Sequence, residues 1–461
     1  MQPDSIDFQA AKSLRFHFAA LHLRTFSLLI LAGLLTALWP NPRLAAQDAV
    51  QPARTETSPP ANDEPTPAPI VEAPQNSRPT PVVTLNDRPV AETPRRFHYG
   101  FVFTLRGAYD DNINLAQNNP DGDFYTSIEP VISLGFGGGG EDQTNRLNFI
   151  YAPNAYIFAK RSDADALQHV IHLDAQRQFA KLTVDLGEDI QILDSSNLTS
   201  LNDTTGRQAN VDVGARTREN VFTTRLGASY DLSSKTSLNG SMNYQVYDYP
   251  SLLSSETIQG SLFLNYNYGA KVIFGIGGTG GYDTAEGPSA DQYFEQINGH
   301  LSYQATGKVT LNATGGIEIR EFANNARGNY TSPVFNLSAN YTPFDGTSLS
   351  LKGSRTTRNS ASISGSDFAQ TNIDFAASQR FFQRAFVAFN VGYENDNYFS
   401  AARNIDVSRA DDYYYIQTSV DLNVTRFWTV GAYYLHREDS SSLDFFQFSD
   451  NQFGVRTSLT F

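Results

Sequence analysis

The chain has 461 residues, with 32 Phe and 23 Tyr but no Cys. Its formal net charge of −14 argues against a nucleic-acid-binding protein, whose partner would itself be an anion. A mean hydropathy of −0.36 excludes a bundle of transmembrane helices. It is compatible with a transmembrane β-barrel, in which apolar and polar residues alternate.

Residues 1–46 are predicted to be a signal peptide. Basic residues such as Lys12 and Arg24 precede the apolar run at 26–39, which is too short to cross a bilayer as a helix. Small residues ending at Ala46 suit cleavage by a signal peptidase. The segment therefore predicts export, with cleavage near Ala46.

Residues 47–95 are predicted to be a disordered, Pro-rich linker. They hold 11 of the 21 Pro residues and almost no aromatic residues, so they cannot bury enough apolar surface to offset the entropy of ordering. In an exported protein the linker is either a plain spacer or an arm that docks a periplasmic partner. The sequence leaves both interpretations open.

The remainder, 96–461, has the pattern of a β-barrel. Ile258 and Leu262 share one parity while Gln259 takes the other, and the same period of two recurs in nearly every segment. Tight turns such as 233–235 alternate with long loops rich in Asp, Asn and Ser. Short turns on the periplasmic side and long loops on the outer side are typical of outer-membrane barrels.

These segments predict an all-β fold, a transmembrane antiparallel up-and-down β-barrel of about 18 strands, with about 16 as the alternative. An even number of strands places both ends of the barrel on the periplasmic side. The expected strands lie near 97–109, 123–137, 144–158, 165–178, 181–193, 216–232, 236–249, 256–268, 271–282, 291–305, 308–322, 329–342, 347–359, 367–380, 384–396, 410–424, 427–437 and 449–461.

The last strand is predicted to act as an assembly signal. Its apolar residues share one parity, and the chain ends in a large aromatic residue. This pattern resembles the assembly signal of bacterial outer-membrane β-barrels, which implies the barrel assembly machinery as a partner. The residues concerned are Phe453, Val455, Leu459 and Phe461.

Two outward positions break the apolar pattern. Glu188 has the parity of Leu186 and Ile190, and a carboxylate facing lipid is costly. We therefore expect a β-bulge there or a position above the bilayer. Arg355 has the parity of Leu351, and we expect it at the outer rim, where phosphates of lipid or lipopolysaccharide would bind it.

The polar faces of the strands are predicted to line an aqueous lumen. Charges of both signs fall on these faces, where they either select solutes weakly or simply satisfy one another. The candidate lumen-lining charges are Arg106, Glu129, Asp185, Arg225, Asp231, Glu318, Arg320, Lys352, Asp374, Glu394, Asp421 and Arg456.

No catalytic residue, metal site or cofactor is predicted. The chain lacks zinc-protease, nucleophile-elbow and CxxC motifs, and His169 and His172 differ in strand parity. Asp110–Asp111 and Asp411–Asp412 resemble the acid pairs of a barrel protease, so an enzyme is the third hypothesis for function. Residues 118–124 offer oxygen ligands suited to Ca²⁺ without the full calcium-loop pattern.

Four short stretches carry a family resemblance. AYDDNIN at 108–114, VGARTREN at 213–220, SYDLSSKTSL at 229–238 and DYPSLLSSET at 248–257 resemble, in this order, the β-barrel porin type 2 family. The resemblance covers about 96–461. It implies an outer-membrane barrel related to members found in exopolysaccharide export clusters, and it supplies no catalytic residues.

Together these observations predict a protein of the cell outer membrane. The leading hypothesis is a porin-like channel for passive passage of small hydrophilic solutes or a polysaccharide, working by size exclusion rather than chemistry. The alternative is a closed structural or surface-binding barrel whose linker docks a periplasmic partner. Membrane lipid, lipopolysaccharide and the assembly machinery are the expected partners, and nucleic acid is not.

Overall fold

The computed structural model describes residues 97–137, 145–198, 209–323, 327–403 and 405–461. The predicted signal peptide and linker lie outside these described residues, so their assignment stays a prediction.

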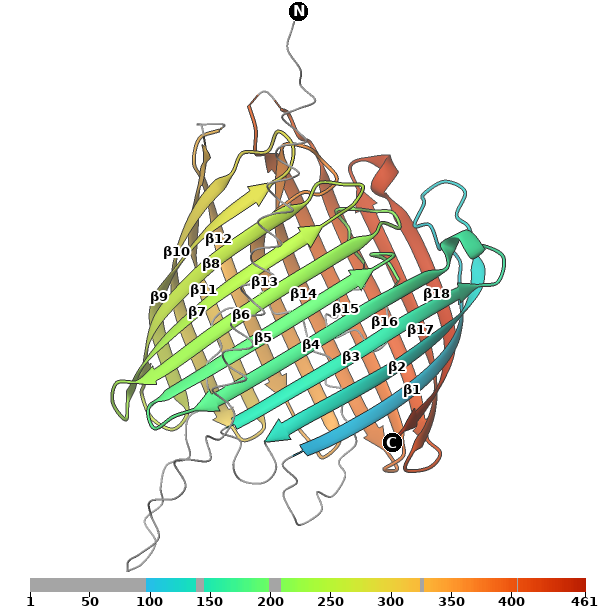
Figure 1. The fold of residues 1–461 in the computed structure, drawn as a ribbon, viewed down its shortest axis with the longest axis horizontal. Helices are drawn as coiled ribbons and strands as arrows, with labels where there is room; N and C mark the ends of the chain where they lie inside the picture. The colour runs from blue at the N-terminus through green and yellow to red at the C-terminus, as the bar shows by residue number, and fades with distance from the viewer. Residues whose placement is uncertain (1–96, 138–144, 199–208, 324–326, 404) are drawn as a thin grey trace, which may run out of the picture. The chain divides into compact units, whose positions relative to one another are not determined.

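The described chain forms one closed, antiparallel β-barrel of eighteen strands, which confirms the predicted fold class (Figure 1). Each strand pairs with its neighbours in sequence, and β1 pairs with β18 to close the ring. The strands are β1 (Phe97–Asp110), β2 (Asp123–Gly137), β3 (Asn145–Phe158), β4 (Ala166–Gln178), β5 (Leu182–Leu193), β6 (Glu219–Asp231), β7 (Thr236–Asp248), β8 (Ser255–Asn267), β9 (Val272–Ala285), β10 (Gln292–Thr306), β11 (Val309–Phe322), β12 (Tyr330–Tyr341), β13 (Thr347–Asn359), β14 (Ser366–Phe381), β15 (Ala385–Ser400), β16 (Ala410–Asn423), β17 (Trp428–Ser441) and β18 (Phe448–Thr460).

The exterior of the barrel is apolar. Ile297, Ile276 and Leu262 leave 75%, 65% and 56% of their surface exposed, although each is a large aliphatic residue. A closed ring leaves no free edge strand, which is what a lipid environment demands of a β-structure. The barrel is therefore of the membrane-spanning kind. Within the described residues, no helix is long and apolar enough to cross a membrane.

The closing seam joins the two ends of the barrel sequence. Backbone hydrogen bonds run from Phe461 N to Phe101 O at 2.8 Å and from Phe101 N to Phe461 O at 3.2 Å, and the two rings stack at 6.1 Å. Phe453, Val455 and Phe461 are 57%, 64% and 58% exposed on the outer face, and Leu459 shares their parity. Recognition of these residues during assembly stays a prediction.

The expected bulge at Glu188 is wrong. The register of β5 runs unbroken through this residue, which pairs with Leu173 on one side and Thr224 on the other. The Thr224 hydroxyl donates a 2.7 Å hydrogen bond to the Glu188 carboxylate on the same outward face. Because the neighbouring strand supplies this donor, the strand keeps its regular pleat. A position above the bilayer remains the expectation for Glu188.

Arg355 has outward parity, but it is among the residues that line the cavity described below, together with its neighbour Phe335. Its Nη1 donates to Thr371 Oγ1 at 2.5 Å. In the β12–β13 ladder, the first pair is Tyr341 with Leu349 and the last pair is Phe335 with Arg355. Beyond this last pair the two strands are not paired with each other. Pro333, just above Phe335, has no N–H to donate, which fits the end of a ladder. Binding of lipid phosphate by Arg355 stays a prediction.

Long loops connect the strands at the end of the barrel opposite to the C-terminus (Figure 1). Four of them matter below: L1 (111–122), L3 (194–218, described except at 199–208), L7 (360–365) and L8 (401–409). L1, L3 and L7 each contain residues that are almost completely buried, so they fold inward rather than standing above the barrel.

Candidate functional site

Part of the barrel interior is filled by an apolar core. Inward-facing aromatic residues such as Tyr156 and Tyr413 are 1% and 3% exposed, because loop residues pack on them. L1 contributes Leu115 and L3 contributes Val211 to the same cluster. The wall that carries this core consists of β1 to β4 and β16 to β18, so side chains and loops fill the lumen beside these strands.

L3 crosses the lumen. It leaves the wall between β5 and β6, yet its Asp212 binds residues of L7 and β15, about half a turn away in a ring of eighteen strands. Asp212 Oδ1 accepts hydrogen bonds from Ser360 Oγ at 2.7 Å and Tyr398 Oη at 3.0 Å. Its Oδ2 accepts one from Ala361 N at 2.7 Å. Asp212 thus anchors the inner end of L3 to the opposite wall.

Arg409 of L8 completes the anchor. Its Nη1 and Nη2 donate to the backbone carbonyls of Asp212 and Val211 at 3.0 and 2.9 Å. The guanidinium also pairs with Asp411 at 2.7 Å and lies 3.4 Å from the centre of the Phe446 ring. Burial alone would lower the pKa of Arg409, but Tyr398 and Asp411 raise it above its usual value. The cation therefore stays charged.

A polar cavity lies between L3 and the other wall, β7 to β14. Its volume is about 1170 Å³, including space open to solvent, and Asn210 and Asp212 of L3 form one side of it. Its walls are mainly amides and hydroxyls, which exchange hydrogen bonds with water at little cost. The uncharged polar lining includes Asn243, Gln245, Thr257, Gln259, Thr279, Gln296, Asn298, Thr314, Asn336, Ser354 and Thr356.

The twelve charged candidates have inward parity, but most of them bind within the wall. Arg106 pairs with Glu129 at 2.6 Å, and both are almost completely buried. Arg320 pairs with Glu318 at 3.0 Å and with Asp283, which sequence analysis did not select. Of the twelve, only Glu318 and Arg320 line the cavity.

Most of the remaining candidates also bind other residues of the wall. Arg456 pairs with Asp421 at 2.5 Å, and Lys352 stands opposite Asp374 in the β13–β14 ladder. Arg225 binds Asp189, and Glu394 accepts a 2.8 Å hydrogen bond from Gln370.

Asp185 packs over Gly227 on the inner face, and Asp231 is exposed where β6 ends at a tight turn. Since opposite charges largely cancel in the wall, the uncharged amides dominate the cavity surface. A role of these charges in permeation stays a prediction.

Sequence analysis did not select Asp212, the residue that holds L3 beside the cavity. Arg358, whose parity does predict a place in the lumen, lines the cavity with its guanidinium 4.8 Å from the Tyr247 ring centre and 5.9 Å from that of Phe368. The sequence does contain one sign that the segment around Asp212 is buried. Val211 and Val213 flank Asp212 in an otherwise polar loop, and apolar residues at that spacing indicate a buried segment.

Asp411 and Asp412 do not form a catalytic dyad. Asp411 faces inward and pairs with Arg409, whereas Asp412 faces outward and accepts a 2.5 Å hydrogen bond from Tyr393 Oη. Asp110 is buried on the inner face at the end of β1. Asp110 and Asp111 lie close to a third carboxylate, described below.

The possible calcium ligands in 118–124 have other partners. Asp121 pairs with Arg161, and Asp123 Oδ2 accepts the backbone N–H groups of Lys160 and Arg161 at 2.8 and 2.9 Å. These carboxylates hold the next loop, so this segment forms no calcium site of its own.

The two histidines on β4 face opposite sides, as their parity predicts. His169 is 2.9 Å from Tyr151 Oη on the outer face, and His172 is 2.6 Å from Asp189 on the inner face. They cannot share a metal ion.

Comparison with known proteins gives a likeness of shape only. No family model and no curated protein matches the chain, so the resemblance to the β-barrel porin type 2 family stays a prediction. Among solved structures, OpdK of Pseudomonas aeruginosa, crystallised with vanillate, is 11% identical with a TM-score of 0.41, covering 79% of this chain and 99% of its own. OccAB3 of Acinetobacter baumannii is 10% identical with a TM-score of 0.41 and the same coverage.

Proposed function

We propose that the protein is an outer-membrane channel through which small hydrophilic solutes pass passively. The observation that carries this proposal is the polar cavity between L3 and the wall from β7 to β14. An apolar exterior places such a barrel in a membrane, and a wide barrel leaves an aqueous interior wherever side chains and loops do not fill it. The export signal predicted at 1–46 supports the outer membrane as its location.

The proposed mechanism is size exclusion combined with hydrogen-bond exchange. Solutes enter from the loop side and follow the amide-lined wall, because the opposite side is filled by the apolar core. Gln259, Asn298 and Asn336 offer donors and acceptors without net charge. Neutral polyhydroxylated solutes such as sugars suit this lining better than ions, because its charges of opposite sign balance. The charged lining residues are Asp212, Asp283 and Glu318 against Arg320, Arg355 and Arg358.

A closed structural barrel is the second candidate, and the anchoring of L3 favours it. If L3 and the apolar core block the lumen completely, the protein serves the envelope through its loops or its linker. Passage of a polysaccharide chain would likewise require L3 to leave its anchor at Asp212.

Swelling of proteoliposomes distinguishes these functions. The refolded barrel, placed in vesicles, is expected to admit small neutral sugars faster than charged solutes of equal size, with a steep fall in rate as the sugar chain lengthens. Entry of long oligosaccharides would favour the polysaccharide route. Vesicles that admit no solute, although the barrel is folded and heat-modifiable, would reject the channel and favour the structural barrel.

A further inference from the structure

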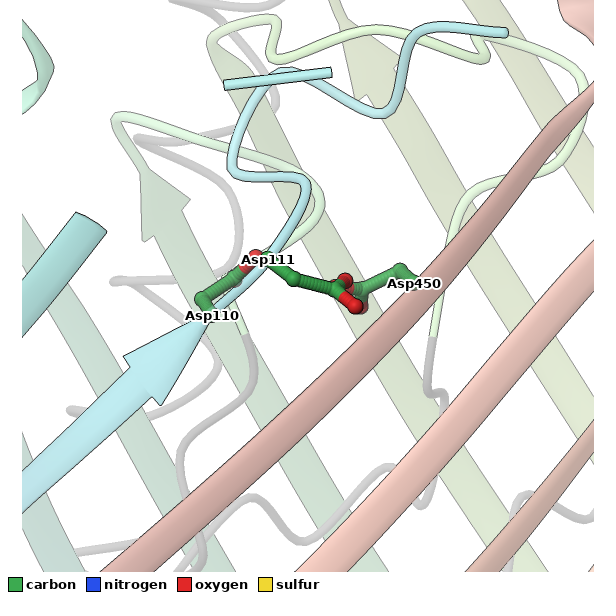
Figure 2. Close-up of side chains that lie close together, drawn as sticks. All are labelled: Asp110, Asp111 and Asp450. Atoms are coloured by element: carbon green, nitrogen blue, oxygen red, sulfur yellow. The ribbon is translucent and has the colours of Figure 1, made fainter. Parts of the chain in front are cut away.

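Three carboxylates meet where the barrel closes, at the loop end of the β1–β18 seam. Asp110 is the last residue of β1, Asp111 begins L1, and Asp450 projects from β18 (Figure 2). One carboxylate oxygen from each residue lies within 4.8 Å of those from the other two. Neither the proposed channel nor the structural barrel gives a role to this cluster, which we call the seam triad.

The seam triad is shielded from water. Asp110 and Asp450 are 1% and 0% exposed, and Asp111 is half-buried. Buried carboxylates at such separations repel one another unless a proton or a cation lies between them. The cost of leaving them ionised and uncompensated would be several kcal/mol, on the order of the whole stability of many domains. The cluster therefore needs a counter-charge.

The described residues supply only part of that counter-charge. Arg437 pairs with Asp450 at 2.6 Å and is itself buried. The guanidinium of Arg216, on a neighbouring loop, donates instead to Ser195 Oγ and to the Ala164 carbonyl. If all three carboxylates are ionised, the single guanidinium that pairs with them among the described residues leaves two negative charges uncompensated. One divalent cation would balance them.

The hydrogen bonds of the Asp450 carboxylate also indicate a bound ligand. Both the Arg437 guanidinium and the Gln452 amide donate to Asp450 Oδ2, at 2.6 and 3.3 Å. Oδ1 of the same carboxylate is buried and accepts no hydrogen bond from an N–H or O–H group in the described part of the chain. A fully buried carboxylate oxygen without a donor is costly, and it is the group that a metal ion would satisfy.

We propose that the seam triad binds one Ca²⁺ ion. Its donors are all carboxylate oxygens, which a hard cation prefers, and it offers no imidazole or thiolate for zinc. Asp110 and Asp111 each retain lone pairs, since Asn112 N, Gln452 and Asn451 donate one hydrogen bond per oxygen. Ca²⁺ accepts irregular shells completed by water, whereas Mg²⁺ demands a regular octahedron.

The bound ion would tie L1 to the closing strand. Asp111 stands between β1 and the L1 residues Ile113 and Leu115, which pack in the apolar core. Ca²⁺ would therefore stabilise both the seam and the filled side of the lumen. A proton shared between Asp110 and Asp450 is the competing account, and it predicts stabilisation by acid rather than by calcium.

Calcium binding is tested on the refolded mature chain in detergent, after treatment with EDTA. Millimolar Ca²⁺ is expected to raise Tm, and Mg²⁺ to raise it less. Tb³⁺ is expected to give tyrosine-sensitised luminescence that Ca²⁺ displaces. Absence of both responses in the wild-type protein would overturn the proposal, and so would stabilisation by mild acid that Ca²⁺ does not reproduce.

Two variants locate the ion. Asp111→Asn removes one ligand charge at the half-buried position and should weaken Ca²⁺ binding about tenfold or more. Asp163→Asn changes an exposed carboxylate that pairs with Arg161 on a nearby loop and should leave Ca²⁺ affinity unchanged. Equal affinity in Asp111→Asn and the wild-type protein would place the ion elsewhere and overturn the assignment to the seam triad.

Discussion

At the scale of single residues, the interior charges mainly stabilise the barrel. Arg106 is enclosed by its Glu129 partner, by Ser127, which accepts from its Nε at 3.0 Å, and by the rings of Tyr125 and Tyr433. Glycine makes part of this enclosure possible. A Cβ on Gly454 would lie 2.2 Å from the Tyr433 ring, so the ring lies flat on the neighbouring strand.

We predict that Glu129→Gln destabilises the barrel by about 3–5 kcal/mol, because it leaves a buried guanidinium without its counter-charge. The measurement is urea-induced unfolding in lipid vesicles. Asp345→Asn is the matched control, since it removes the partner of Arg380 at a side chain that is 95% exposed. The control should cost less than about 1 kcal/mol. Equal stability of Glu129→Gln and the control would contradict the structural role of this pair.

At the scale of elements, the anchor of L3 decides how much of the lumen is open. Asp212 is the acceptor for L7 and β15, and an alanine there removes every one of those hydrogen bonds. The Arg409 bonds go to backbone carbonyls and would remain. The anchor should therefore loosen without unfolding of the barrel.

We predict that Asp212→Ala raises single-channel conductance and makes the current noisier, because L3 then leaves its central position for part of the time. Asp163→Asn, an exposed loop carboxylate outside the anchor, is the control and should conduct as the wild-type barrel does. A folded Asp212→Ala barrel with unchanged conductance and noise would mean that L3 does not limit the passage.

The β14–β15 hairpin carries a second element-scale prediction. Its turn residues Phe382 and Gln383 have φ values of 49° and 62°, in the left-handed region that costs most residues about 1–2 kcal/mol each. Phe382 is also 94% exposed, so its ring gains nothing from packing within the chain.

Replacing Phe382 with Asn and Gln383 with Gly should stabilise the barrel by about 1–2 kcal/mol, because Asn-Gly suits a turn with two positive φ values. Equilibrium unfolding in vesicles measures the gain. A loss of stability would show instead that Phe382 makes a favourable contact with the membrane interface, where aromatic residues concentrate.

At the scale of the whole molecule, the sequence predicted the barrel but not the path through it. Period-two alternation is a local property of each strand, so the eighteen strands and their inward faces follow from it. Whether the lumen is open depends on contacts between residues far apart, such as Asp212 and Ser360, which are 148 positions apart. The Val211 and Val213 pair indicated burial but not the wall against which L3 packs.

The off-centre position of the passage is the central claim, and cysteine-directed block tests it most directly because the chain has no native Cys. Thr257→Cys places a thiol on the cavity wall of β8, and Ala152→Cys places one on the inner face of β3, at a side chain only 4% exposed. A bulky methanethiosulfonate reagent, applied to single channels in planar bilayers, is expected to reduce the current of Thr257→Cys and leave Ala152→Cys unaffected. Equal block of both variants, or a folded wild-type barrel without current, would contradict the account.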